Sequence, residues 1–313
     1  MKNNWLTLKS LFLCVSALSA SGLILSGCTE NANLNVGEWS LEYDAHANGI
    51  DISKGSKLIY DNVYAAYKLA DSVVSTRDYA KHHVSTKKIN DHFGEGYHYE
   101  VTYTGNNLPV LVQSFYVYPT KDYVLTDFTL ESTSEMASNY MAPVNVDRMP
   151  EVLNQGENNR ALDCWIRYQS HPLTFTELTS YEVTAIFNND DREAMVIGSV
   201  EHDSWKTGIT IGKGNIYNVG SLVCYGGVAD KTTRDSKPHG ALKGTTIKSP
   251  KILVGFFEDW REGMEEYAQA NAVIAPPKAW DKAVPFGWNS WGALQFNLTY
   301  PKALEVSDFY KEN

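Results

Sequence analysis

The sequence has little of the positive charge that nucleic-acid-binding proteins carry. Its 27 Lys and Arg residues are outnumbered by 37 Asp and Glu residues, which gives a formal net charge of −10. Binding to DNA or RNA depends on Lys and Arg side chains that meet phosphates, so a nucleic-acid partner is not expected. Beyond the N-terminal segment the sequence also lacks an apolar run of the roughly 20 residues that a membrane-spanning helix needs.

Cysteine is scarce as well, with 4 residues in the chain. None has the spacing to other cysteines or to histidines that a zinc site needs, and we expect neither a metal nor another cofactor. Cys14 and Cys28 lie near the N-terminus, which leaves Cys164 and Cys224 for the folded part. An oxidising compartment permits a disulfide between these two, and a pair of buried free thiols is the equal alternative.

Residues 1–27 have the pattern of a cleavable lipoprotein signal peptide. Lys2 and Lys9 give a positive start, and a short apolar run follows over 11–25. The run ends in Leu25-Ser26-Gly27-Cys28, which resembles the bacterial lipobox. Cys28 is therefore the predicted lipidation site. An ordinary signal peptide with a chance cysteine is the alternative.

Residues 28–36 then form a polar, Asn-rich stretch that we expect to be a lipidated tether. Several acyl chains on one residue anchor a protein stably, where a single chain does not. The predicted mature protein is exported and lipid-anchored, at the outer membrane or the periplasmic face of a Gram-negative bacterium. The membrane is therefore an expected partner, to which the lipid on Cys28 anchors the protein.

Residues 37–258 show one short predicted strand after another. Tyr97–Thr104 alternates with a period of two, and Gly105–Asn107 supplies turn residues before a second strand over 108–118. A further hairpin is predicted over 181–200, and long helical periodicity is absent. Many short strands with turn signals between them predict a large antiparallel β-sandwich, in a mainly β fold.

The pattern changes at Asp259. Asp259 and Glu262 have the spacing of a capping box, and apolar residues recur at helical spacing from Trp260 to Asn271. We expect an amphipathic linker helix in the segment 259–282. Its apolar stripe either docks on a neighbouring domain or forms part of the sandwich core.

The segment 283–313 reads as the start of another domain. An apolar run leads into Phe286-Gly287-Trp288-Asn289-Ser290-Trp291, and the residues from Pro301 onward are compatible with a helix. This predicts one βα unit. A parallel strand needs strands beside it and helices over both faces, so one βα unit is incomplete as a folding unit. We therefore expect the sequence to be the N-terminal part of a longer architecture.

The stretch Gly287–Trp291 resembles the G-W-N-S-W opening of the catalytic barrel in melibiase-type α-galactosidases, the clan D glycoside hydrolases. Residues 252–263 are similar to the sandwich-to-barrel junction of the same enzymes. The resemblance covers about residues 250–313, and over 37–250 it rests on strand pattern and size. It implies a galactose-mutarotase-like supersandwich followed by a (β/α)8 TIM barrel, of which 283–313 is the truncated start.

The resemblance carries over at few positions. In the family the second tryptophan of the motif lines the sugar pocket, which makes Trp291 the predicted substrate-binding residue, with Trp288 and Asn289 in supporting roles. A core aromatic at a domain boundary is the alternative for Trp291. The resemblance implies hydrolysis of terminal α-linked galactose or a related sugar with retention, by two aspartates of later barrel strands. A retaining glycosidase holds two carboxyl groups about 5–5.5 Å apart. No residue here matches those aspartates, so this chain holds no catalytic residue and is expected to be inactive alone.

The alternative function is of another class, a carbohydrate-binding or structural surface lipoprotein that binds glycan through exposed aromatic side chains. Within the sandwich, His98 and Glu100 lie two residues apart on one strand and form a less favoured acid–base pair, as a sugar epimerase would need. A metal site among His82, His83 and His92 is also disfavoured, since adjacent strand residues point to opposite faces.

Overall fold

The computed structural model describes residues 33–154, 156–164, 168–227, 240–284 and 287–312. The predicted signal peptide and Cys28 lie outside the described residues, so cleavage and lipidation stay predictions. The chain divides into two compact units, the first running to Ala275 and the second from Pro276 to Asn313. No helix in the described part of the chain is both long enough and apolar enough to cross a membrane.

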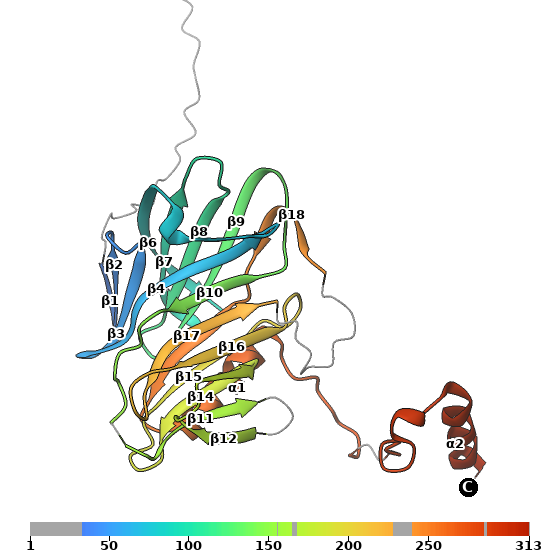
Figure 1. Cartoon of the computed structure of the whole chain (residues 1–313). Coiled ribbons are helices and arrows are strands. Elements are labelled where there is room, and N and C mark those ends of the chain that lie inside the picture. Colours follow the sequence, from blue (N-terminus) through green and yellow to red (C-terminus); the bar gives the residue numbers. More distant parts are fainter. Residues whose placement is uncertain (1–32, 155, 165–167, 228–239, 285–286, 313) are drawn as a thin grey trace, which may run out of the picture. The chain divides into compact units, whose positions relative to one another are not determined.

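The first unit consists of two antiparallel sheets (Figure 1). One has the strand order β1-β2-β3-β4-β10-β17-β16-β13, with β5 paired to β4. Its strands are β1 (Asn33–Val36), β2 (Trp39–Asp44), β3 (Gly49–Lys54), β4 (Lys57–Leu69), β5 (Ser72–Ser75), β10 (Met141–Val146), β13 (Glu177–Tyr181), β16 (Thr207–Lys213) and β17 (Val219–Gly226). A short 3₁₀ helix, η1 (Thr76–Asp78), follows β5. We call this the nine-stranded sheet.

The other sheet has the order β12-β11-β14-β15-β19-β9-β8-β7-β6, with β18 paired to β9. Its strands are β6 (Lys81–Asp91), β7 (Gly94–Thr104), β8 (Val110–Val117), β9 (Tyr123–Ser138), β11 (Asn159–Cys164), β12 (Tyr168–Pro172), β14 (Val183–Asn188), β15 (Ala194–Ser199), β18 (Leu242–Lys248) and β19 (Ile252–Phe257). We call this the ten-stranded sheet. The two layers confirm the predicted mainly β fold with a large antiparallel β-sandwich.

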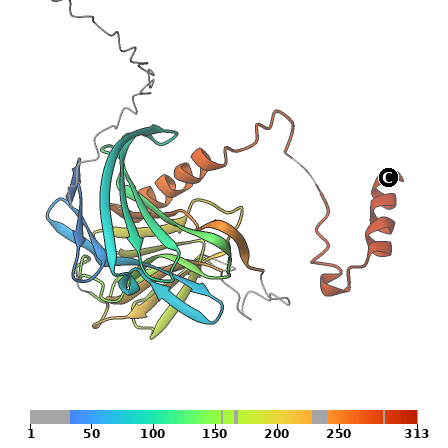
Figure 2. The ribbon, with the colours of Figure 1, turned by 90° about the horizontal axis from the view of Figure 1, so that it is seen from above.

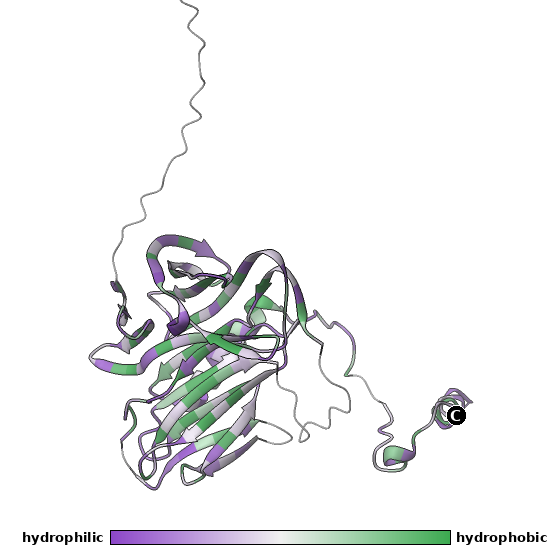
Figure 3. Ribbon diagram, turned by 45° about the horizontal axis from the view of Figure 1, so that its top comes forward, coloured by the Kyte–Doolittle hydropathy of each residue, from purple (hydrophilic) through white to green (hydrophobic). Residues whose placement is uncertain are grey.

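The core lies between the sheets because alternate side chains of each strand point inward. On β7, the inward Tyr99, Val101 and Tyr103 are fully buried, as is Phe115 on β8. Hydrophobic and hydrophilic residues interleave along the strands accordingly (Figure 3). Large aromatic side chains fill much of this space, among them Trp39, Tyr60, Tyr67 and Phe128. Each such ring buries a large apolar area, which drives the two layers together.

Both predicted hairpins are confirmed. β7 and β8 pair from Tyr97 opposite Val117 to Tyr103 opposite Leu111, around the predicted turn. β14 and β15 pair in the same antiparallel manner, with Val183 opposite Gly198.

The expected tether over 28–36 is too long. Asn33–Val36 form β1, which pairs with β2, so the sandwich already includes residues N-terminal to the expected start at Gly37. Leu34 and Val36 are 7% and 5% exposed, whereas Asn33 and Asn35 face solvent. The segment alternates with a period of two, and its apolar residues belong to the core. The asparagines made the whole segment look like a polar tether.

Helix α1 (Trp260–Ile274) begins where predicted, because the Asp259 side chain accepts a hydrogen bond from the backbone N of Arg261. The helix covers the outer face of β14, β15 and β19, as Figures 1 and 2 show. Its apolar stripe therefore joins a second core within the first unit, with Trp260, Met264 and Tyr267 packed against it. Docking on a neighbouring domain, the other alternative of the sequence analysis, is wrong for this stripe.

The second unit contains a 3₁₀ helix, η3 (Gln295–Asn297), and helix α2 (Tyr300–Glu312). The helix of the expected βα unit is thus present, with Pro301 in its first turn. The strand is not formed in the described ranges 276–284 and 287–312. A parallel strand gains its hydrogen bonds from neighbouring strands, and these residues provide none.

Candidate functional site

The Gly287–Gly292 motif forms a compact turn. The Asn289 side-chain oxygen accepts a 2.9 Å hydrogen bond from the backbone N of Trp291. The backbone N of Leu294 then donates to the Ser290 carbonyl over 2.8 Å, which continues the chain into η3. Asn side chains fold back on the backbone in this way in turns. Asn289 therefore helps to set the position of Trp291, and its supporting role in a sugar site stays a prediction.

The two tryptophans of the motif have different surroundings. Trp291 is 53% exposed, and its ring meets Phe296 edge to face with centroids 5.0 Å apart. Trp288 lines a hollow of about 360 Å³ together with Val306 and Tyr310 of α2. Trp291 does not line this hollow. Its assignment as a sugar-binding residue stays a prediction.

Apolar side chains of the second unit are open to solvent throughout its described part. None of the described residues from 276 to 312 is buried. The large exposed ones are Trp280, Val284, Trp288, Trp291, Phe296, Leu298, Tyr300, Leu304, Phe309 and Tyr310. Soluble proteins seldom expose so much contiguous apolar surface unless it is an interaction surface. The exposed apolar side chains of the second unit are therefore a candidate interaction surface.

In the sandwich, the predicted His98–Glu100 pair lies on the outer face of β7. His98 Nε2 and Glu100 Oε2 are 3.8 Å apart, which is too long for a hydrogen bond. The His98 ring stacks on Tyr116 with centroids 4.6 Å apart, and His98 is only 8% exposed. Burial, with the nearby Lys87 ammonium, lowers the pKa of His98 to about 4. A neutral ring without a proton-transfer partner does not act as the acid–base pair considered from the sequence.

A buried carboxylate lies next to this stacked pair. Asp127 on β9 is 2% exposed and is paired with Lys251 at 2.6 Å and with Lys248 at 3.3 Å. The Lys251 ammonium also lies 3.6 Å from the centroid of the Tyr116 ring. A buried charge is tolerated when it is paired in this way. The cluster links β9 to the end of β18 and to the segment between β18 and β19, and it has a structural character.

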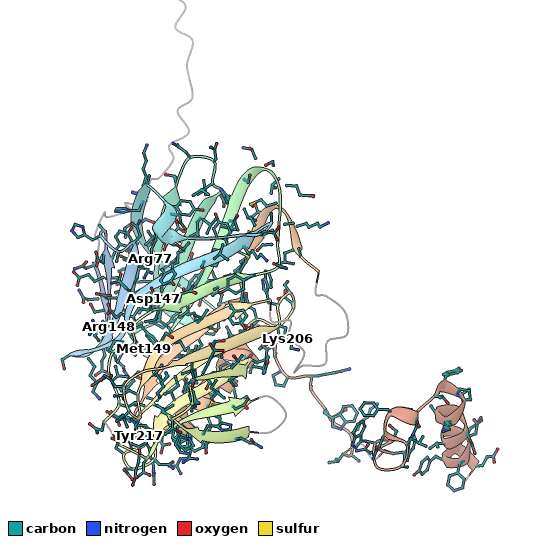
Figure 4. The ribbon with its side chains drawn as sticks, viewed as in Figure 1. Arg77, Asp147, Arg148, Met149, Lys206 and Tyr217 are labelled. Carbon is teal, nitrogen blue, oxygen red and sulfur yellow. The ribbon has the colours of Figure 1, made fainter. Side chains whose placement is uncertain are left out.

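A second polar cluster lies on the nine-stranded sheet, where Arg77 and Asp147 are labelled in Figure 4. Arg77 Nη1 is 2.5 Å from Asp147 Oδ2, and its guanidinium lies 3.8 Å from the centroid of the Tyr64 ring. The Tyr64 hydroxyl donates to Asp147 Oδ1 over 2.8 Å. Both carboxylate oxygens are engaged, so this cluster is a closed structural unit. Its members are far apart in sequence, and sequence reasoning had no signal for it.

The remaining candidates from the sequence are dispersed. Cys164 and Cys224 are free thiols, the first partly and the second fully buried, so the disulfide alternative is not formed in this structure. The His82 ring packs on Tyr43 with centroids 4.5 Å apart. Among the described residues, no three His, Cys, Asp or Glu side chains gather as a metal site would require.

No family model matches the sequence, and none of the curated proteins is similar enough to count as a relative. Solved structures are similar in fold. A β-arabinopyranosidase aligns over 88% of this chain with a TM-score of 0.55 and 13% identity. An α-N-acetylgalactosaminidase from Bifidobacterium bifidum aligns over 78% with a TM-score of 0.54 and 11% identity. A GH36 α-galactosidase from Geobacillus stearothermophilus aligns over 88% with a TM-score of 0.51 and 11% identity.

The matched part is less than half of each of these proteins. The chain covers 48%, 39% and 47% of the arabinopyranosidase, the acetylgalactosaminidase and the α-galactosidase, respectively. At these identities the similarity concerns the fold. The chain has the fold of an α-galactosidase-like N-terminal domain, an antiparallel β-sandwich followed by a helix.

Proposed function

We propose that this chain is the N-terminal portion of an exported, lipid-anchored glycoside hydrolase of the α-galactosidase type. The complete protein hydrolyses terminal α-linked galactose or a related sugar with retention. Its two catalytic carboxyl groups lie outside residues 1–313. The sandwich and α1 brace a catalytic barrel, and the second unit contributes the first part of that barrel.

The uncovered apolar surface of the second unit carries this proposal. Ten large apolar side chains between Trp280 and Tyr310 are exposed. Each has a cost in water that burial removes, about 25 cal/mol per Å² of apolar area. Strands and helices of a (β/α)8 barrel would cover such a surface on both sides of its first unit. The similarity in fold to glycoside hydrolases and the G-W-N-S-W motif support the proposal of an α-galactosidase-type barrel.

Retention by two carboxylates gives the proposal a chemical test. One carboxylate attacks the anomeric carbon, and the other donates a proton to the leaving oxygen and later takes one from water. The longer protein should release α-galactose first from p-nitrophenyl α-galactoside, as followed by proton NMR of the fresh product. The 313-residue chain should release none. Release of β-galactose first would contradict retention, and hydrolysis by the 313-residue chain would contradict the placement of the carboxylates.

A second candidate function is a surface lipoprotein that binds glycan without hydrolysis. The observation in its favour is that the sandwich and α1 together bury two hydrophobic cores without help from the second unit. Such a unit is able to serve as a binding module. Glycan binding without hydrolysis by the longest product found in cells would favour this alternative.

A further inference from the structure

The inner face of β7 passes from closed core to open hollow within a few residues. Tyr99, Val101 and Tyr103 on this face are fully buried between the sheets. Tyr97 is the next residue on the same face, and it is only partly buried. Its neighbour across the ladder is Lys88 of β6, which is exposed. The end of the β6–β7 hairpin therefore extends an inner, aromatic face beyond the packed core.

This extension forms a cavity of about 500 Å³. Lys88, Asn90, Glu95 and Tyr97 line it, and Pro119 closes one side. Small-molecule sites in proteins have volumes of about 300–1,000 Å³. The volume is thus sufficient for one or two sugar rings.

The polar groups of the cavity surround the Tyr97 ring. The Lys88 ammonium lies 6.0 Å from the centroid of that ring. In the described part of the chain, the Asn90 and Glu95 side chains make no hydrogen bond or ion pair. Together an ammonium, an amide and a carboxylate offer both donors and acceptors. An aromatic face with such groups at its rim suits a ligand that has an apolar face and hydroxyls around its edge.

The hairpin end is held in place from its other side. Asp91 accepts a 2.7 Å hydrogen bond from the Tyr118 hydroxyl through one oxygen and a 2.9 Å bond from the backbone N of Phe93 through the other. The Phe93 and Tyr118 rings lie 5.8 Å apart. Position 96 requires glycine, because a Cβ there would lie 2.6 Å from the carbonyl oxygen of Val117. The cavity is therefore preformed, and a ligand pays little for ordering it.

From this geometry we infer that the end of the β6–β7 hairpin binds a neutral pyranose sugar, which stacks on Tyr97 and hydrogen-bonds to Lys88, Asn90 and Glu95. One positive and one negative side chain balance each other in the site, which favours an uncharged sugar over a uronic acid. This site is formed by β6, β7 and Pro119 of the sandwich. It stands whether or not the complete protein hydrolyses galactosides.

The test measures sugar binding by the 313-residue chain with saturation-transfer NMR and calorimetry. The probes are D-galactose, N-acetyl-D-galactosamine and, as the charged comparison, D-galacturonate. We expect millimolar or tighter binding of a neutral sugar, a loss of at least tenfold in Tyr97→Ala, and affinity close to wild type in Tyr97→Phe. The exposed Asn90→Ala and Glu95→Gln, which leave the core intact, should each weaken binding. Tyr140→Ala, in the turn between β9 and β10, should not.

Several results would overturn the inference. They are the absence of binding to both neutral sugars, binding of galacturonate alone, and full affinity in Tyr97→Ala and Asn90→Ala. Circular dichroism melts show whether each variant is folded. Hydrolysis is assayed separately with p-nitrophenyl α-galactoside on the longer protein, so failure of the binding site and failure of the proposed function are told apart.

Discussion

The hydroxyl of Tyr267 on α1 donates a 2.7 Å hydrogen bond to the backbone carbonyl of Ser199 on β15. The Tyr267 ring lies directly over Gly198, where a Cβ would be 2.5 Å from a ring carbon. Helix and sheet approach this closely only because Gly198 has no side chain. The contact fixes α1 on the sandwich and so sets where the chain leaves it.

This contact predicts the effect of adding one methyl group. Gly198→Ala should lower the free energy of unfolding by about 1–3 kcal/mol, because overpacking forces the helix or the Tyr267 ring to shift. Urea unfolding followed by tryptophan fluorescence measures the change. Gly240→Ala is the control, since a Cβ there meets nothing within 4 Å. Equal stability of the two variants would show that α1 does not pack on Gly198.

His98 predicts a loss of stability in acid. Burial lowers the pKa of His98 from 6.5 to about 4. Between these values the unfolded chain binds a proton that the folded protein excludes, so stability falls as the pH is lowered. The loss is up to about 3 kcal/mol by linkage. Unfolding measured from pH 7 to pH 4 should show a shallower slope in His98→Phe, which keeps the stacking on Tyr116.

The exposed His46 provides the control for this prediction. His46→Gln should keep the full acid slope. An unchanged slope in a folded His98→Phe variant would contradict the assignment of acid sensitivity to His98.

His202 should make stability depend on pH in the opposite direction, so that stability is lost as the pH rises. Its Nδ1 lies 3.0 Å from Glu182 Oε2, and its Nε2 lies 2.6 Å from Asn271 Oδ1 on α1. Hydrogen bonding to Glu182 raises the pKa of His202 above 6.5. The stabilisation from this pairing is fully present below 6.5 and is lost as the pH rises through the raised pKa.

An NMR titration of the His202 ring protons measures that pKa. In Glu182→Gln the pKa should fall toward 6.5, and Asn271→Ala should lower it less. A His202 pKa that is the same in wild type and Glu182→Gln would rule out the ion pair. Both groups are partly exposed, so the contribution to stability is small.

Trp291 predicts a substrate-binding effect in the longer protein. Trp291→Ala should lower kcat/KM for p-nitrophenyl α-galactoside on the order of tenfold or more, since an aromatic contact is worth about 1 kcal/mol beyond its buried area. Trp280→Ala removes another exposed tryptophan of the second unit and is the matched control. Similar kinetics for both variants would assign Trp291 to packing.

Local patterns were sufficient to predict several elements. The β7–β8 hairpin follows from period-two alternation and the Gly105–Asn107 turn, and α1 follows from the Asp259 cap. β1 was missed because the asparagines beside Leu34 and Val36 conceal its alternation. Local signals identify an element when its own residues carry the pattern.

Long-range relationships were beyond the sequence. No pattern within the segment 259–282 predicts that its apolar stripe packs on β15. The close packing of the Tyr267 ring on β15 depends on Gly198, which is distant in the sequence. The Arg77–Asp147 pair joins residues 70 positions apart. For the proposed sugar site, alternation places Tyr97 on the face of Tyr99. Only the packing of the two sheets decides that Tyr99 is core and Tyr97 lines a cavity.

The size of the native protein tests the central proposal most directly. An antibody raised against residues 37–277 is used to blot the membrane fraction of the source cells. The proposal predicts a band well above the 35.0 kDa of this chain, by about 200 or more residues, as a complete barrel requires. A band at or just below 35.0 kDa would contradict a catalytic barrel in this product and leave the glycan-binding alternative.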